Sequence, residues 1–177
     1  MDNKLGSGMG MSIGSSVSGG VEDILYARNV MNETSGQWGM GIHIKTRTAY
    51  GGYIKNVIYE DNTFDVAGVP GGALHIESGY QSGHGEGCDY ANCTAISNIT
   101  FRNLSFANSG GTGGIVCFPS RPCESIVFEN VHVANQAGKA GWPCSDVASG
   151  SFTDVTPPRD TSKSNCNFTA LSHKDIA

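Results

Sequence analysis

The sequence has no apolar run long enough to cross a membrane and no long stretch with helical periodicity. Its apolar segments fall short of the ~20 residues that a transmembrane helix needs. Charged residues make up 15% of the chain, the net charge is −5, and the Lys and Arg residues are scattered. We therefore expect no membrane segment and no nucleic-acid-binding surface. Regular apolar alternation also excludes a disordered chain.

Metal-type cysteine spacing is missing as well. The six cysteines stand at C-x4-C, C-x5-C and C-x21-C. A zinc site is typically marked by C-x2-C with interleaved histidines, and neither is present. We expect no metal and no other cofactor.

An even cysteine count at short spacings favours sequential disulfides formed in an oxidising compartment, with six reduced core thiols as the alternative. The expected pairs are Cys88–Cys93, Cys117–Cys123 and Cys144–Cys166. The last pair would tie a tail, residues 142–177, back onto the final coil. Five N-x-[ST] sequons also favour secretion and glycosylation; they begin at Asn32, Asn92, Asn98, Asn103 and Asn167.

A short strand pattern is repeated four times. The copies are GMGMSIGS at 8–15, GMGIHIKT at 39–46, GGALHIES at 71–78 and GGIVCFPS at 113–120. Each copy alternates apolar and polar residues, as a strand with one buried face does. Repeats at intervals of 20–50 residues are typical of stacked architectures, so the pattern predicts a β-solenoid.

A second strand pattern alternates with the first. It starts at Val21, Tyr53, Ala95 and Cys123. An Asn follows the core residue in each copy, at Asn29, Asn62, Asn103 and Asn130. Such amides would stack at the turns, and the first two copies carry an extra residue that suggests a bulge.

Together the two patterns predict one all-β domain over residues 1–177, a parallel β-helix of about four coils. Its start, Met1 to Lys4, is polar and runs directly into a strand, although natural solenoids cap their ends. We therefore expect the C-terminal part of a longer protein. The predicted core comprises Ile24, Ile44, Val57, Ile76, Ile99, Phe101, Val116, Phe118 and Val127.

Residues 6–147 carry a resemblance to a known family. GMGMSIGS, GIHIKT, LHIESGY and CFPSRPCESIVFENV, in this order and spacing, resemble segments of the polygalacturonases, glycoside hydrolase family 28. The resemblance implies a right-handed parallel β-helix of the pectin-lyase type. It further implies inverting hydrolysis of α-1,4-galacturonosyl links in pectin by a secreted, monomeric enzyme that acts on the cell wall.

The catalytic residues of that family do not map onto this chain. Inverting glycosidases need one carboxylic acid and one carboxylate, and the family supplies them upstream of its G-H-G segment. This chain begins near that segment, and Asp2 is too close to Met9 to match. The family's histidine maps onto Met9, which cannot transfer a proton. We expect no catalytic residue here and an inactive chain.

Three residues map onto the family's substrate cleft. His43 and Lys45 replace the family's R-I-K, and Tyr80 matches its cleft tyrosine. A lysine ammonium is a point cation for a galacturonate carboxylate, whereas His43 is charged only in mildly acidic surroundings. The alternatives are a solvated lysine, an ordinary outward histidine and a loop aromatic. His75 would stack with His43 or belong to a surface ladder.

Two local matches are interpreted as chance. Gly83-His84-Gly85 imitates the G-H-G segment but lies in a glycine-rich loop. Glu77 and Asp89 are both acidic, but nothing in the sequence places them on one face at the separation that glycoside hydrolysis needs.

Three functions stay open. The chain is part of a pectin hydrolase, or a non-catalytic β-helix that binds acidic polysaccharide or serves as a scaffold. A weaker possibility is action on another uronic-acid polymer, such as rhamnogalacturonan or xylogalacturonan. The sequence that precedes Met1 in the gene separates the first two: N-x-D followed by D-D favours the enzyme.

Overall fold

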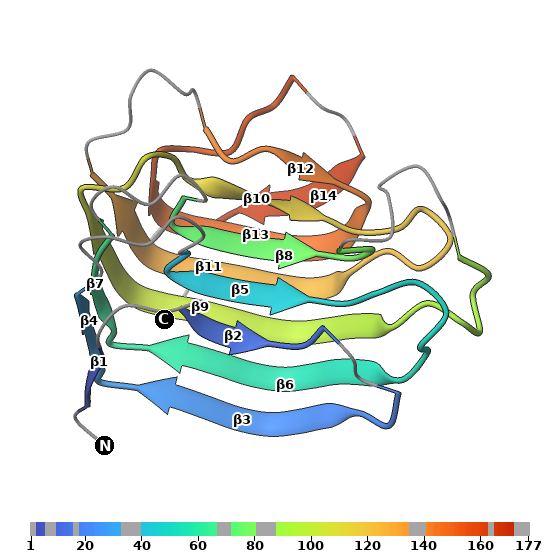
Figure 1. Ribbon diagram of the computed structural model, residues 1–177. Helices are drawn as coiled ribbons and strands as arrows, with labels where there is room; N and C mark the ends of the chain where they lie inside the picture. The colour runs from blue at the N-terminus through green and yellow to red at the C-terminus, as the bar shows by residue number, and fades with distance from the viewer. Residues whose placement is uncertain are drawn as a thin grey trace.

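The computed structural model describes residues 3–5, 10–15, 18–32, 40–66, 72–80, 88–134, 141–162 and 165–171. These residues form parallel strands in two sheets, and no helix occurs among them. The chain winds upward in Figure 1, from β3 at the bottom to β12 and β14 at the top. Since no described residue is helical, none belongs to a helix that could span a membrane.

The five-stranded sheet lies in front in Figure 1 and has the order β12-β10-β8-β5-β2. Its strands are β2 (Met11–Ile13), β5 (Ile42–Lys45), β8 (Leu74–Glu77), β10 (Gly113–Val116) and β12 (Cys144–Ser145). Four of them, β2, β5, β8 and β10, lie within the four copies of the first sequence pattern. The fifth, β12, pairs with β10 and adds a short further rung to the predicted stack of about four.

The nine-stranded sheet lies behind and is built mostly from the second pattern. Its long strands are β3 (Val21–Ala27), β6 (Tyr53–Glu60), β9 (Ala95–Ala107), β11 (Glu124–Val133), β13 (Val147–Thr156) and β14 (Cys166–Ala170). Short strands continue the lower rungs along the left edge of Figure 1: β1 (Lys4–Leu5), β4 (Val30–Asn32) and β7 (Thr63–Asp65).

The core fills the space between the two sheets with columns of like side chains. Parallel in-register pairing places one residue of each rung above its counterpart. Tyr26, Tyr59, Phe101, Phe128 and Phe152 form one such column, with successive ring centroids 4.7, 5.4, 4.9 and 4.6 Å apart. Aromatic contacts of this kind add roughly 0.5–1.5 kcal/mol each to the area that they bury.

Most of the predicted core is buried, but two residues were placed on the wrong face. Val116 and Val127 are half-exposed, whereas Ile115 and Phe128 are fully buried. The fourth copy of the first pattern is displaced by three residues, because Ile76 pairs with Ile115 and not with Phe118. In a strand an odd shift exchanges the two faces, so Val116 lies outside. Ile24 is partly buried against the core, and the other predicted residues are buried.

The asparagine column also differs from the prediction. Asp61, not Asn62, stands beside Asn103, whose amide donates to the Asp61 carboxylate at 2.8 Å. Both residues have a left-handed backbone conformation, with φ values of 55° and 51°, which Asn and Asp tolerate best among non-glycine residues. Residues of β6 and of β7 pair with β9 at one constant offset in sequence. The predicted extra residue, and the bulge that it would cause, are therefore absent between these strands.

Asn29 and Asn62 instead lie one residue further along and point into the core. They are 6% and 1% exposed. Asn29 donates its backbone N–H and its side-chain amide to Asn62 Oδ1, each at 2.9 Å. Asn62 donates in turn to the Tyr26 carbonyl at 2.8 Å, so this buried column satisfies its own polar groups.

The three predicted disulfides are confirmed. The Cα atoms are 5.4 Å apart in Cys88–Cys93, 5.8 Å in Cys117–Cys123 and 6.4 Å in Cys144–Cys166. Cys144 begins β12 and Cys166 begins β14, so the last disulfide joins the two sheets at the end of the solenoid. The segment expected as a tail thus contributes β12, β13 and β14.

Candidate functional site

The outward face of the five-stranded sheet gathers the polar residues of the first pattern. In β5, Ile42 and Ile44 point into the core, so His43 and Lys45 point away from it. The register then places His43 beside His75 and Lys45 beside Glu77 on β8. Neighbouring strands are ~4.8 Å apart, so these four side chains form one compact group.

His43 is the centre of this group and is fully buried although it lies on the outward face. Its Nε2 lies 3.2 Å from Glu77 Oε2, and its Nδ1 is buried without a hydrogen-bond partner among the described residues. A buried N–H without an acceptor is costly. The structure therefore favours a proton on Nε2, donated to Glu77.

Tyr80 packs against His43 from the turn that follows β8. The two rings meet edge to face, with centroids 5.3 Å apart and planes at 86°. The Tyr80 backbone N–H donates to the Thr46 carbonyl at 2.7 Å. Gly79 makes this turn possible: its φ is +82°, and a Cβ there would lie 2.6 Å from the Phe118 ring.

Lys45 completes the group above the same tyrosine. Its Nζ lies 4.7 Å from the Tyr80 ring centroid, a cation–π contact. The structure thus brings together the three residues that the resemblance assigned to the cleft, His43, Lys45 and Tyr80. His75 joins them with its ring centroid 6.0 Å from that of His43.

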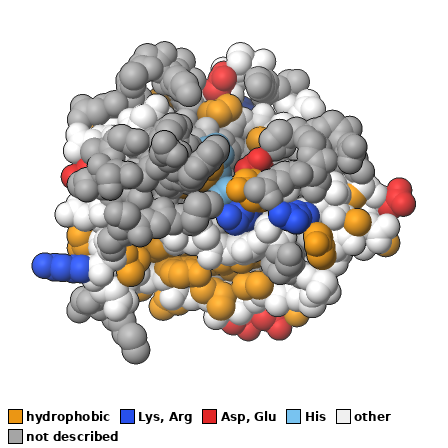
Figure 2. Space-filling model, in the orientation of Figure 1, with side chains coloured by type: hydrophobic (Ala, Val, Ile, Leu, Met, Phe, Trp, Pro, Cys, Tyr) orange, Lys and Arg blue, Asp and Glu red, His pale blue; other side chains and the backbone are white. Residues whose placement is uncertain are grey.

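Figure 2 shows this face from the front. Histidine side chains lie at its centre, with basic side chains and an acidic one close by. Positive charge, negative charge and imidazole are therefore gathered on one part of this face.

Glu77 is the residue that sequence reasoning undervalued. It is 15% exposed in its side chain and forms the ion pair or hydrogen bond with His43. The signal was present in the repeat: Glu77 occupies in the third copy the position of Lys45 in the second. Only the strand register shows that the two neighbours therefore share a face.

The described strands of this sheet hold a single carboxylate, Glu77. Glycoside hydrolysis by inversion requires two carboxyl groups, about 6.5–9.5 Å apart. The described residues also include no group of three or more His, Cys, Asp or Glu side chains suited to a metal ion. Met9 and the Gly83-His84-Gly85 segment lie outside the described residues.

Comparisons with known proteins agree with the fold. The family model of glycosyl hydrolases family 28 matches residues 1–153. A probable polygalacturonase of Vitis vinifera is 30% identical over 174 residues, covering 92% of this chain and 33% of that protein. A probable endopolygalacturonase D of Neosartorya fischeri is 28% identical over 131 residues, covering 74% of this chain and 27% of that protein.

Exopolygalacturonase B of Aspergillus niger is 29% identical over 108 residues, covering 58% of this chain and 24% of that protein. No solved structure matches the chain significantly. The chain thus spans a third or less of the length of these relatives. Given the family match over most of its length and its right-handed parallel β-helix, the chain belongs to family 28 of the glycosyl hydrolases.

Proposed function

We propose that this chain forms part of the galacturonate-binding cleft of a pectin-degrading β-helix. The observation that carries the proposal is the convergence of Lys45, Tyr80 and His43 on the outward face of one sheet. The relatives are named as polygalacturonases, which supports an acidic galacturonan as the substrate class.

Each of the three residues has a role that its chemistry suits. The Lys45 ammonium pairs with a galacturonate carboxylate, because it is a compact cation with three donors. The Tyr80 ring gives a flat apolar surface for a sugar face. His43, held by Glu77 at 3.2 Å, supports the Tyr80 ring edge and keeps that surface in place.

The chain alone does not hydrolyse galacturonan in this proposal. Glu77 is the single carboxylate on the described strands of the cleft sheet, and it is engaged with His43. The acid and base that inversion requires come from outside this chain. Loss of a positioned acid or base costs about 10²–10⁴-fold each. The three disulfides further support an extracellular location, since such bonds persist in oxidising compartments.

The test compares two lysines that lie equally far from a tyrosine ring, although Lys55 also forms an ion pair with Glu22 at 2.8 Å. Lys55 on β6 lies 4.7 Å from the Tyr53 ring, as Lys45 does from the Tyr80 ring, but Lys55 belongs to the other sheet. We expect Lys45→Ala to weaken the binding of trigalacturonate about tenfold and Lys55→Ala to leave it unchanged, as measured by calorimetry or NMR titration.

Binding through a solvent-accessible cation also weakens as salt rises, so the affinity of the wild-type chain should fall between 0.05 and 0.5 M NaCl. Equal affinities of wild type and Lys45→Ala would remove Lys45 from the site.

The non-catalytic alternative is favoured by the shortage of carboxylates. It is distinguished by an assay of the gene's complete product: absence of reducing-sugar release, with binding retained, would support it.

A further inference from the structure

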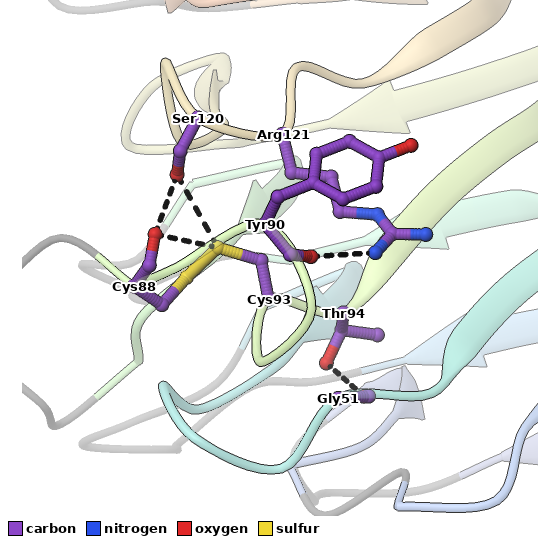
Figure 3. Close-up of a disulfide and its surroundings, with 7 residues drawn as sticks. All are labelled: Gly51, Cys88, Tyr90, Cys93, Thr94, Ser120 and Arg121. Carbon is purple, nitrogen blue, oxygen red and sulfur yellow. Dashed lines mark hydrogen bonds between the residues drawn. A yellow bond between two sulfur atoms is a disulfide. The ribbon is translucent and has the colours of Figure 1, made fainter.

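Tyr90 is the most exposed large apolar side chain among the described residues, with 66% of its surface accessible. It lies between Cys88 and Cys93, in a loop that their disulfide closes. Figure 3 shows the loop with the tyrosine ring projecting from it beside the Arg121 side chain. A single exposed aromatic ring is common, but this one lies against a cation in a loop that a disulfide closes.

The ring is held by its neighbours. Arg121 Nη1 donates to the Tyr90 carbonyl at 2.6 Å, and the guanidinium carbon lies 4.3 Å from the ring centroid. At the base of the loop, Ser120 Oγ donates to the Cys88 carbonyl at 2.7 Å. The disulfide and these hydrogen bonds hold the loop backbone, and the guanidinium contacts the ring, so a ligand would meet a largely preorganised surface.

Beside the ring lies a small hollow of about 120 Å³. Its polar lining is varied: Arg121 is a donor, Glu124 is an acceptor when ionised, and the Ser97 hydroxyl can be either. Its remaining lining is Tyr90, Ala95, Ile96 and Pro122. Since one cation and one anion border the hollow, it has no net charge to attract a polyanion.

The loop is also joined to the candidate cleft. In the turn after β5, the Thr46 carbonyl accepts a hydrogen bond from the Tyr80 N–H at 2.7 Å. A few residues later, the Gly51 N–H donates to the Asn92 carbonyl at 3.0 Å. One short segment thus contacts both the cleft turn and the Tyr90 loop.

We propose that Tyr90, Arg121 and Glu124 form a second saccharide site that takes a neutral sugar. A pyranose ring stacks on Tyr90, and its hydroxyls accept from the Arg121 guanidinium and donate to the Glu124 carboxylate. A uronate fits less well, because Glu124 repels its carboxylate and Arg121 is already bonded to the Tyr90 carbonyl. The proposal rests on the proposed function for the expectation that the chain meets pectin, whose neutral branches would supply such sugars.

The test uses two probes, β-1,4-galactotetraose as the neutral sugar and trigalacturonate as the acidic one, in NMR titrations of the disulfide-bonded chain. We expect Tyr90→Ala to weaken galactotetraose binding at least about tenfold and to leave trigalacturonate binding unchanged. Tyr90→Phe keeps the ring and should retain most of the affinity. Tyr50→Ala removes another exposed tyrosine, 41% accessible and outside the hollow, and should have no effect.

Several outcomes would overturn the second site: no binding of galactotetraose by the wild-type chain, equal binding by Tyr90→Ala, or binding of trigalacturonate through Tyr90 instead. The Lys45→Ala variant separates this proposal from the previous one. If it leaves trigalacturonate binding intact, the cleft assignment fails, while the Tyr90 result for galactotetraose stands on its own.

Discussion

At the scale of single residues, burial decides which polar groups have a fixed protonation or tautomeric state. His43 has one nitrogen beside Glu77 and the other buried without a hydrogen-bond partner among the described residues. Tyr59 is fully buried, and this burial raises its pKa well above the ordinary value, with the neighbouring Tyr26 charge as a smaller cause. Each arrangement makes a measurable prediction.

Removing the Glu77 carboxylate should destabilise the chain by stranding the His43 N–H. We expect Glu77→Ala to lower the free energy of unfolding by about 1–3 kcal/mol. Glu77→Gln keeps an acceptor oxygen and should lower it by less than about 1 kcal/mol. Urea denaturation measures both, and ¹⁵N NMR of the His43 ring should show a proton on Nε2. A proton on Nδ1, or equal losses in the two variants, would contradict the assigned contact.

Tyr59 should make the chain less stable in alkali. Its folded pKa is raised, whereas the unfolded phenol ionises near pH ~10. The stabilisation is therefore complete below pH ~10 and is lost as the pH rises above it, when the unfolded chain alone releases the proton. We expect Tyr59→Phe to flatten the decline of unfolding free energy between pH 9 and 11, by up to ~1.4 kcal/mol per pH unit. An unchanged slope would refute the assignment.

At the scale of elements, the rungs are locked together by two kinds of asparagine column. The inner column, with Asn29 and Asn62, is buried, and its two residues bond to each other and to the Tyr26 carbonyl. The outer column is exposed and uses left-handed residues, with Asn130 donating to Asn103 at 2.9 Å and Asn103 to Asp61 at 2.8 Å. Buried hydrogen bonds cost more to break than exposed ones, so the two columns differ in importance.

We expect Asn62→Ala to lower the free energy of unfolding by more than about 2 kcal/mol, because the Asn29 donors and the Tyr26 carbonyl lose their partner. Asn103→Gly is the control: glycine retains the left-handed conformation, and the lost bonds are exposed, so the loss should stay below about 1 kcal/mol. Chemical denaturation of both variants measures the difference. Similar losses would show that burial of the column contributes little.

At the scale of the whole molecule, the disulfides constrain loops of different lengths. Cys144 and Cys166 are 22 residues apart and join β12 to β14, whereas Cys117 and Cys123 are 6 apart. All four cysteines are at least 95% buried, so their replacement by alanine removes similar packing. Chain entropy then makes the longer loop the greater stabiliser, at about 3 against about 2 kcal/mol.

We therefore expect the double variant Cys144→Ala/Cys166→Ala to unfold at a lower urea concentration than Cys117→Ala/Cys123→Ala. The difference should be near 1 kcal/mol. If the short loop proves the more important, local packing rather than loop length controls the contribution of these bonds.

The sequence by itself determined the periodic features of this protein. Alternating apolar residues in the two repeated patterns predicted parallel strands stacked in coils, and short cysteine spacings predicted the three disulfides. These features are local, because strand alternation and loop length are properties of neighbouring residues. The resemblance also selected Lys45 and Tyr80, which do meet in space.

Only the tertiary structure decided which residues lie beside one another across the rungs. The strand register turned Val116 to the outward face, moved the asparagine column by one residue, and placed Lys45 beside Glu77. The tertiary fold also brought Arg121 onto Tyr90, about thirty residues away in the chain. Such contacts join residues from different coils, and a shift of one position exchanges the faces of a strand. No pattern within a single copy therefore carries that information.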